Sequence, residues 1–180
     1  KIIADSNGGQ LRGMDISERD YIKVPKSTGK SHVGEVSKSK ATGKPIAPFG
    51  APVYSSSGQF LGVVGCVANI NFISDKIGAV KIGETGYAYV LNKEGVVIAH
   101  PKADFILEKN LAKEEGMVEF AQQMLARKSG TGKYALAGVE KIGGYAPVEL
   151  TAWSVGVVQD YEELMAPAVS IRNFMMLITA

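Results

Sequence analysis

The sequence repeats itself at a nearly constant spacing, and this repeat limits what the chain can fold into. Three short phrases recur in the same order: Ile3-Ala4 returns as Ile98-Ala99, "APV" at 51–53 returns at 146–148, and "GVV" at 62–64 returns at 156–158. The offsets are 98 − 3 = 95, 146 − 51 = 95 and 156 − 62 = 94 residues. Three matches in register are much harder to obtain by chance than any one alone. The 180 residues are therefore predicted to form two copies of one module.

The second copy is complete enough to predict its elements. The phrase "TGYAYVLNKEGVVIAHP" contains two strand-like runs around a turn in which Gly95 suits a positive φ angle. In "EGMVEFAQQMLARKSG" apolar residues recur at helical spacing, and Gly130 is a candidate C-cap. The phrases "GKYALAG", "KIGGYAPVE" and "WSVGVVQD" predict three more strands. This order predicts an α+β module, an antiparallel sheet with helical cover, as in PAS-like domains.

Two finer predictions concern burial. In the first strand of this copy, Tyr87, Tyr89 and Leu91 alternate with Ala88 and Val90, which predicts one well-packed face. The single cysteine, Cys66, lies in the apolar run "LGVVGCVANI" and is predicted to be a small buried residue.

The first copy lacks its beginning when the two copies are aligned. "KIIAD" at 1–5 aligns with the second strand of the later copy, so the first strand and any helix before it are missing from this sequence. Apolar residues spaced by three and four between the copies predict a linking helix. The predicted organisation is an N-terminally incomplete module at 1–70, a linking helix at 71–82, a second module at 83–164 and a C-terminal helix at 165–180.

Composition and motifs exclude several classes of function. The net charge is +2, and basic residues alternate with acidic ones, so we expect no nucleic-acid partner. The two histidines, His32 and His100, have no second ligand at metal-binding spacing, so we expect no metal and no cofactor. His100 is instead predicted to cap a strand end. A phosphate loop at "STGKS" would need glycine where Val24 stands, which counts against a nucleotide-dependent enzyme.

Five phrases in this order resemble the double Cache (dCache) family: "DISERDYIK", "SKSKATGKPI", "APVYSSSGQFLGVVGCVANINFISDKI", "KIGETGYAYVLNKEGVVIAHP" and the closing "WSVGVV". The resemblance covers nearly the whole chain, and "GETGYAYV" followed by "HP" is its most specific part. It implies tandem PAS-like (Cache) modules, a membrane-distal one and a membrane-proximal one. It also implies a long helix before the first module, which this sequence lacks, and a last helix that runs into a membrane segment.

The resemblance implies that the distal module holds a ligand, and it suggests five residues for the site. Arg19 offers a bidentate fork for a carboxylate, although an ion pair with Asp15 or Asp20 is an even alternative. The others are Tyr21, Ser37 and Ser39, and Tyr54, for which core packing is the stronger alternative.

The amino-acid-binding members of the family carry acidic residues that hold the ligand's amine. Here Ser37 and Ser39 fall where a tyrosine and an aspartate are expected, and Val67 falls at the final aspartate. Without those carboxylates a buried ammonium would lack a partner, so an organic acid suits Arg19, Lys38 and the serines better than an amino acid.

The function predicted from these features is small-molecule sensing, not catalysis. The resemblance implies an extracytoplasmic (periplasmic) domain of a bacterial or archaeal methyl-accepting chemotaxis receptor. Such a receptor is anchored in the cell membrane by segments outside this chain and works as a homodimer in signal transduction. A sensor histidine kinase, a diguanylate cyclase or an interaction domain without a ligand remain alternatives. Since "FMMLITA" after Arg172 carries no charge, Ala180 is expected close to a membrane.

Overall fold

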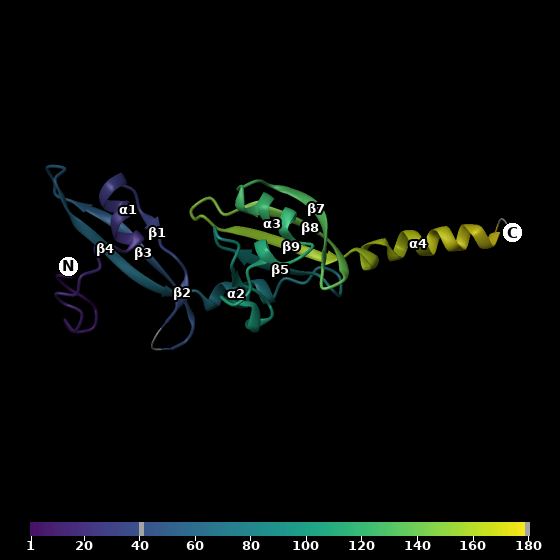
Figure 1. The fold of residues 1–180 in the computed structure, drawn as a ribbon, viewed down its shortest axis with the longest axis horizontal. Helices are drawn as coiled ribbons and strands as arrows, with labels where there is room; N and C mark the ends of the chain where they lie inside the picture. The colour runs from purple at the N-terminus through teal and green to yellow at the C-terminus, as the bar shows by residue number, and fades with distance from the viewer. Residues whose placement is uncertain (40–41, 179–180) are drawn as a thin grey trace. The chain divides into compact units, whose positions relative to one another are not determined.

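The computed structural model describes residues 1–39 and 42–178. It divides into two compact units, Lys1–Ile70 (unit 1) and Asn71–Ala180 (unit 2), coloured purple to blue and teal to yellow in Figure 1. Each unit contains an antiparallel sheet with helices packed on it. The predicted α+β class, with antiparallel sheets and helical cover, is confirmed. Thr179 and Ala180 lie outside the described residues, and so does the expectation placed on Ala180.

Unit 2 contains a five-stranded antiparallel sheet in the order β6-β5-β9-β8-β7. Its elements follow the predicted order of two strands, a helix and three strands, although two short 3-10 helices, η1 and η2, precede the helix. Their bounds are β5 (Tyr87–Leu91), β6 (Val97–Ala99), η1 (Ala103–Phe105), η2 (Leu111–Lys113), α3 (Val118–Leu125), β7 (Gly130–Leu136), β8 (Val139–Pro147) and β9 (Ser154–Asp160).

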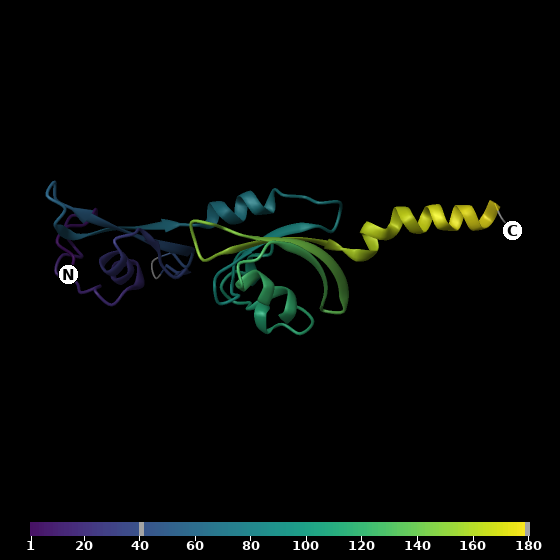
Figure 2. The same cartoon turned by 90° about the horizontal axis from the view of Figure 1, so that it is seen from above.

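The core of unit 2 lies where α3 and the segment before it cover one face of this sheet. Figure 2 shows α2 (Asn71–Gly78) and α3 on opposite sides of the strands. The prediction of a single well-packed face for β5 was therefore wrong, because Ala88 and Val90 are also buried, with α2 packed against β5. Apolar side chains from strands and helix fill the α3 side: Tyr89, Leu91, Val97, Leu111, Met117, Phe120, Met124, Tyr134 and Val158.

The end of α3 differs from the prediction. Gly130 does not cap the helix but begins β7, and the helix ends at Leu125 with Ala126 as its C-cap. The chain then turns at Arg127, which has a φ of 56°, an uncommon value for a residue with a side chain. Its guanidinium donates hydrogen bonds to the carbonyl oxygens of Thr151 and Val148, at 2.6 and 3.2 Å, and these bonds hold the turn in place.

The sheet of unit 1 is smaller, and it is built around one long strand. The central strand β3 (Pro45–Tyr54) pairs along one edge with β4 (Phe60–Asn69) and along the other with both β1 (His32–Val33) and β2 (Ser37–Lys38). The helix α1 (Asp20–Thr28) packs on one face of this sheet. Among the described residues, β4 has no strand neighbour other than β3.

Two predictions for unit 1 were wrong. Residues Lys1–Asp5 are not a strand, and they pair with no strand in the described part of unit 1. Instead Ile2 exchanges backbone hydrogen bonds with Gly13 and Met14, and the Asp5 carboxylate accepts three backbone N–H groups. Cys66 is exposed rather than buried, because nothing in the described part of unit 1 covers that side of β4.

The linking helix and the last helix both differ in extent from the predicted ranges. The linking helix was predicted over 71–82, but α2 ends at Gly78, since glycine is a poor helix former and Ile82 bridges back to Gly86. The last helix, α4 (Tyr161–Ile178), begins four residues earlier than the predicted 165. It continues through Pro167, and its far half exposes Ile171, Phe174 and Met175 rather than packing on the sheet.

Candidate functional site

The first turn of α1 packs directly against two glycines of the unit 1 sheet, Gly50 in β3 and Gly65 in β4. A Cβ on Gly50 would lie 1.7 Å from the backbone oxygen of Tyr21, so only glycine permits this approach. The opposite residue in β4, Gly65, lies under the Tyr21 ring, 3.6 Å from its Cε2 to an ideal Cβ position. The backbone of α1 therefore lies in close contact with β3, and the Tyr21 ring covers the backbone of β4 at Gly65.

Strand pairing places Ser37, a predicted ligand residue, and Val67, which falls at the position of the family's final aspartate, on this same face. Ser37 pairs directly with Ile46, which shares a face with Gly50 because the two are four residues apart in one strand. Val67 follows Gly65 by two residues in β4, so it also lies on the α1 side. Tyr21, Ser37 and Val67 thus share one face of the sheet, at the end nearer the start of α1.

Arg19 occupies the N-cap position of α1 and is exposed. The ion pairs weighed from the sequence do not form in the described structure. The Asp20 carboxylate accepts backbone N–H groups from Tyr21 and Glu35 and lies 3.7 Å from His32 Nε2, while Asp15 accepts both the backbone N–H and the hydroxyl of Ser17. The guanidinium is thus available to an anion.

The other two predicted residues are engaged elsewhere. Ser39 lies in the turn that joins β2 to β3, where its hydroxyl accepts the backbone N–H of Thr42 at 3.3 Å. Tyr54 lies four residues beyond Gly50 along β3, about 13 Å away at the usual rise per strand residue. Its ring packs edge-on against Phe60, and its hydroxyl lies by the α1 C-cap, Gly29. Ser37, through its partner Ile46, lies four residues from Gly50 in the opposite direction, so the structure places Ser37 and Tyr54 toward opposite ends of β3, on either side of Tyr21.

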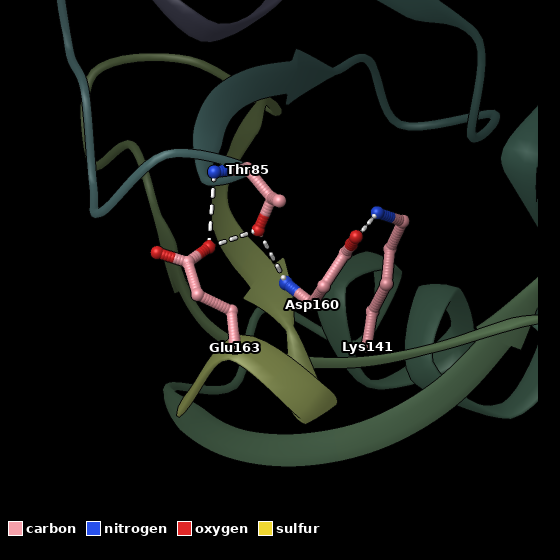
Figure 3. A network of polar contacts seen from close by, with 4 residues as sticks. All are labelled: Thr85, Lys141, Asp160 and Glu163. Carbon is pink, nitrogen blue, oxygen red and sulfur yellow. Dashed lines mark hydrogen bonds and ion pairs between the residues drawn. The ribbon is translucent and has the colours of Figure 1, made fainter. Parts of the chain in front are cut away.

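A second region of interest is the point where α4 leaves the unit 2 sheet (Figure 3). The Glu163 carboxylate accepts the backbone N–H groups of Glu84 and Thr85, at 2.8 and 3.0 Å, and the Thr85 hydroxyl. These bonds lower the pKa of Glu163 to about 2, the Thr85 hydroxyl having the largest effect. Gly83 has a φ of 58°, and a Cβ there would collide with the Glu163 carboxylate.

The same network continues into the sheet. The backbone N–H of Asp160 donates to the Thr85 hydroxyl at 3.1 Å, and the Asp160 carboxylate forms an ion pair with Lys141, its partner in the register of β8 and β9. Lys133 of β7 lies over the ring of Tyr161, the first residue of α4, with its Nζ 3.3 Å from the ring centre. The start of α4 is thus fixed to both the sheet and the loop before β5.

His100, predicted to cap a strand end, is 4% exposed, and its Nδ1 accepts the backbone N–H of Lys102 at 2.8 Å. Burial, with a smaller contribution from the Lys102 charge, lowers the pKa of His100 to about 4. The imidazole is therefore neutral at pH 7. Among the described residues, no group of three or more His, Cys, Asp or Glu side chains is placed to hold a metal ion.

The sequence profile of the family described as Cache domain, in its double form, matches residues 1–168. The chain belongs to the Cache domain family. Among curated proteins, this Cache chain is similar to the methyl-accepting chemotaxis protein McpA of Bacillus subtilis (strain 168), with 24% identity over 169 residues. That match covers 93% of the chain and 24% of McpA, so the chain spans about a quarter of the length of this relative.

Solved structures of two sensors have similar folds. The ligand-binding domain of Mlp24, solved with asparagine, is 27% identical, with a TM-score of 0.63 over 86% of this chain and 60% of that one. The extracellular domain assigned to the histidine kinase mmHK1S-Z2 is 25% identical, with a TM-score of 0.71 over 83% of this chain and 57% of that one. These neighbours are a ligand-binding domain and an extracellular domain, which agrees with a sensor class for this Cache chain.

No helix in the described part of the chain has both the length and the apolar content that a membrane crossing requires.

Proposed function

We propose that this Cache chain is the extracytoplasmic sensing domain of a transmembrane chemoreceptor, with unit 1 as its ligand-binding, membrane-distal module. The observation that carries this proposal is the arrangement at the start of α1. Arg19, which has no ion-pair partner in the described structure, and the Tyr21 ring both come from the start of α1, while Ser37 comes from β2, and Tyr21 and Ser37 share one face of the sheet. An exposed guanidinium at the start of the helix, with an aromatic ring and a hydroxyl on the sheet face that the helix covers, is suited to a small anionic ligand.

The ligand we propose is a small organic acid. Asparagine is bound by the neighbour Mlp24, and an amino acid brings an ammonium group that needs an anionic partner once it is desolvated. On the α1 face of β4, Val67 stands where amino-acid-binding relatives are expected to have an aspartate, and β4 contains no acidic residue. Carboxylate recognition by Arg19 requires no such partner.

The effect of ligand binding would be transmitted through α4. The first turn of this helix is bound to the rest of unit 2 by hydrogen bonds from the Glu84 and Thr85 backbone to the Glu163 carboxylate. We propose that unit 2 is the membrane-proximal module, that α4 continues toward a membrane segment outside this chain, and that the receptor functions as a homodimer in chemotaxis. A sensor histidine kinase is the second candidate, supported by the similarity to mmHK1S-Z2. Both candidates share the same sensing step.

Calorimetry with acetate, succinate, glycine and asparagine tests the proposal. We expect an acid to bind and the two amino acids not to bind. Replacing Arg19 with alanine should abolish acid binding, and Arg19→Lys should weaken it because lysine lacks the planar fork. Arg12→Ala is the matched control, since Arg12 is also exposed in unit 1 but lies outside α1. Tight binding of asparagine, or full affinity in Arg19→Ala, would contradict the proposal.

A further inference from the structure

Unit 2 contains a cavity that the proposed function does not use. Its volume is about 770 Å³, within the range of about 300–1,000 Å³ that is usual for small-molecule sites. The cavity lies between the start of β5, the segment that follows β6, and the hairpin of β7 and β8. Its aromatic and charged lining residues are Tyr87, His100, Lys102, Phe105, Lys109, Glu114, Glu115 and Lys141.

One wall of this cavity is aromatic. The rings of His100 and Phe105 are stacked with centroids 4.7 Å apart, and the Tyr87 ring meets His100 edge-on at 5.0 Å. Apolar side chains on the other side, Leu136 and Val139, complete the lining. A flat apolar body of a ligand would be desolvated between these surfaces, which favours binding.

His100 offers a hydrogen-bond donor in this wall. Its Nδ1 accepts the backbone N–H of Lys102, so in the neutral ring the proton lies on Nε2. No partner for Nε2 occurs among the described residues, although the side chain is more than nine-tenths buried. Because His100 lines the cavity, this N–H can donate to a ligand acceptor there.

The charges around the cavity leave one cation without a carboxylate. Lys109 pairs with Glu114 at 3.0 Å, and Lys141 pairs with Asp160. The ammonium of Lys102 contacts the Phe105 ring instead, 5.7 Å from its centre, and pairs with no acid in the described part of the chain. Since Lys102 and His100 are adjacent at the cavity, the two donors suit a single carboxylate.

We propose that this cavity is a second ligand site, independent of unit 1, which binds a small organic anion with a flat apolar body. The carboxylate contacts Lys102 and His100 Nε2, and the body packs along His100, Phe105 and Tyr87. Lys141 joins this cavity to the α4 network, because its ammonium pairs with Asp160 while its side chain lines the cavity. A bound anion would also attract Lys141, so occupancy acts directly on the contacts that hold α4.

The test uses the 180-residue chain and benzoate as the probe, with benzamide and benzylamine as matched uncharged and cationic probes. Titrations followed by two-dimensional NMR should show benzoate perturbing the amides of 100–116 and 135–141. Benzamide should bind about fivefold more weakly or worse, because it loses the charge-assisted bond. Tighter binding of benzylamine would overturn the proposal, since it would assign the site to Glu114 and Glu115.

Variants separate this site from unit 1. Lys102→Gln removes the charge from an exposed side chain but keeps most of its length and a polar end, and it should weaken benzoate binding about fivefold or more. Lys113→Gln is the control, since Lys113 is exposed in the same segment but does not line the cavity. In Arg19→Ala, the benzoate titration of the cavity amides at 100–116 and 135–141 should follow the wild type, whatever happens to signals from unit 1. Unchanged affinity in Lys102→Gln, or no perturbation of the cavity amides, would overturn the proposal and leave the unit 1 proposal standing.

Discussion

The strands β4 and β9 occupy the same place in the sequence repeat, yet they have opposite environments. In unit 2, β9 pairs with β5 on one edge and β8 on the other, and Val158 is 1% exposed. In unit 1, β4 pairs only with β3 among the described residues, and the equivalent Val64 is 60% exposed. The phrase "GVV" is identical in the two strands. Burial is therefore set by the neighbouring elements and not by the local sequence.

The largest difference in the free energy of unfolding is expected between alanine substitutions at Gly156 and Gly62, the glycines that begin this phrase in the two strands. An alanine at Gly156 would place its Cβ 2.5 Å from Cζ of the buried Tyr89 ring, whereas Gly62 has no atom within 4 Å of that position. We expect Gly156→Ala to destabilise unit 2 by about 3 kcal/mol through overpacking. Urea unfolding followed by the fluorescence of Trp153, the single tryptophan, reports on unit 2 directly.

Gly62→Ala is the matched control for that comparison. Its effect on the free energy of unfolding should stay within about 0.5 kcal/mol. Hydrogen exchange of the β3 and β4 amides measures it in unit 1. If both variants lost the same amount of stability, β4 would have to be buried as β9 is, and this would contradict the difference in environment between the two strands.

A smaller difference is expected at the two valines that close the phrase. Val158→Ala removes methyl groups from the core cluster and should cost about 2 kcal/mol. Val64→Ala should change the free energy of unfolding by less than about 0.5 kcal/mol, because that side chain is mostly exposed. The same fluorescence and exchange measurements apply. A costly Val64→Ala would reveal a covering partner on β4.

Unit 2 should also lose stability on mild acidification, because of His100. The pKa of this histidine is about 4 in the folded chain and about 6.5 when unfolded, so between these values only the unfolded state takes up the proton. The free energy of unfolding should then fall as pH decreases from about 6.5 to about 4, by roughly 3 kcal/mol at most, since one pKa unit is about 1.4 kcal/mol. In His100→Gln this pH dependence should disappear, and its persistence would contradict the assignment.

The smallest effect on stability is expected from Glu163, in the first turn of α4. The pKa of Glu163 is lowered to about 2, so its stabilising bonds are complete above pH 4.5 and are lost as pH falls toward 2. Glu163→Gln should abolish that acid-induced change and, at pH 7, speed hydrogen exchange at the amides of Glu84 and Thr85. Glu162→Gln, its exposed neighbour, is the control. Unchanged exchange in Glu163→Gln would mean that this carboxylate does not hold α4.

The sequence predicted the type and order of the strands and the helix of unit 2, which depend mainly on neighbours along the chain, although it did not predict where α3 ends. The repeat predicted two units, and the strand and helix patterns of the second copy predicted β5 to β9 and α3 in order. Met117, Phe120 and Met124 are buried as their helical spacing implies. The "GETGYAYV" phrase carried the resemblance that the family match confirms.

For the candidate site, the sequence chose residues but not their arrangement. It selected Tyr21 and Ser37, which share a face, together with Tyr54, which lies toward the other end of α1. It did not find the cavity in unit 2, because Tyr87, Lys102 and Lys141 are far apart in the chain and meet only across the sheet and the segment that covers it. The histidine before Pro101 was the only local signal, and it fitted a strand cap equally well.

Pairing and cover across the sheet were decided only by the tertiary structure. "KIIAD" has the composition of a strand but forms none, because a strand is stable only when its backbone groups pair with a neighbour. Cys66 lies in an apolar run but is exposed, because no helix or strand in the described part of unit 1 covers its side of β4. Local pattern therefore determined which segments can be strands and helices in this protein, and long-range contact determined which of them are paired, buried or available to a ligand.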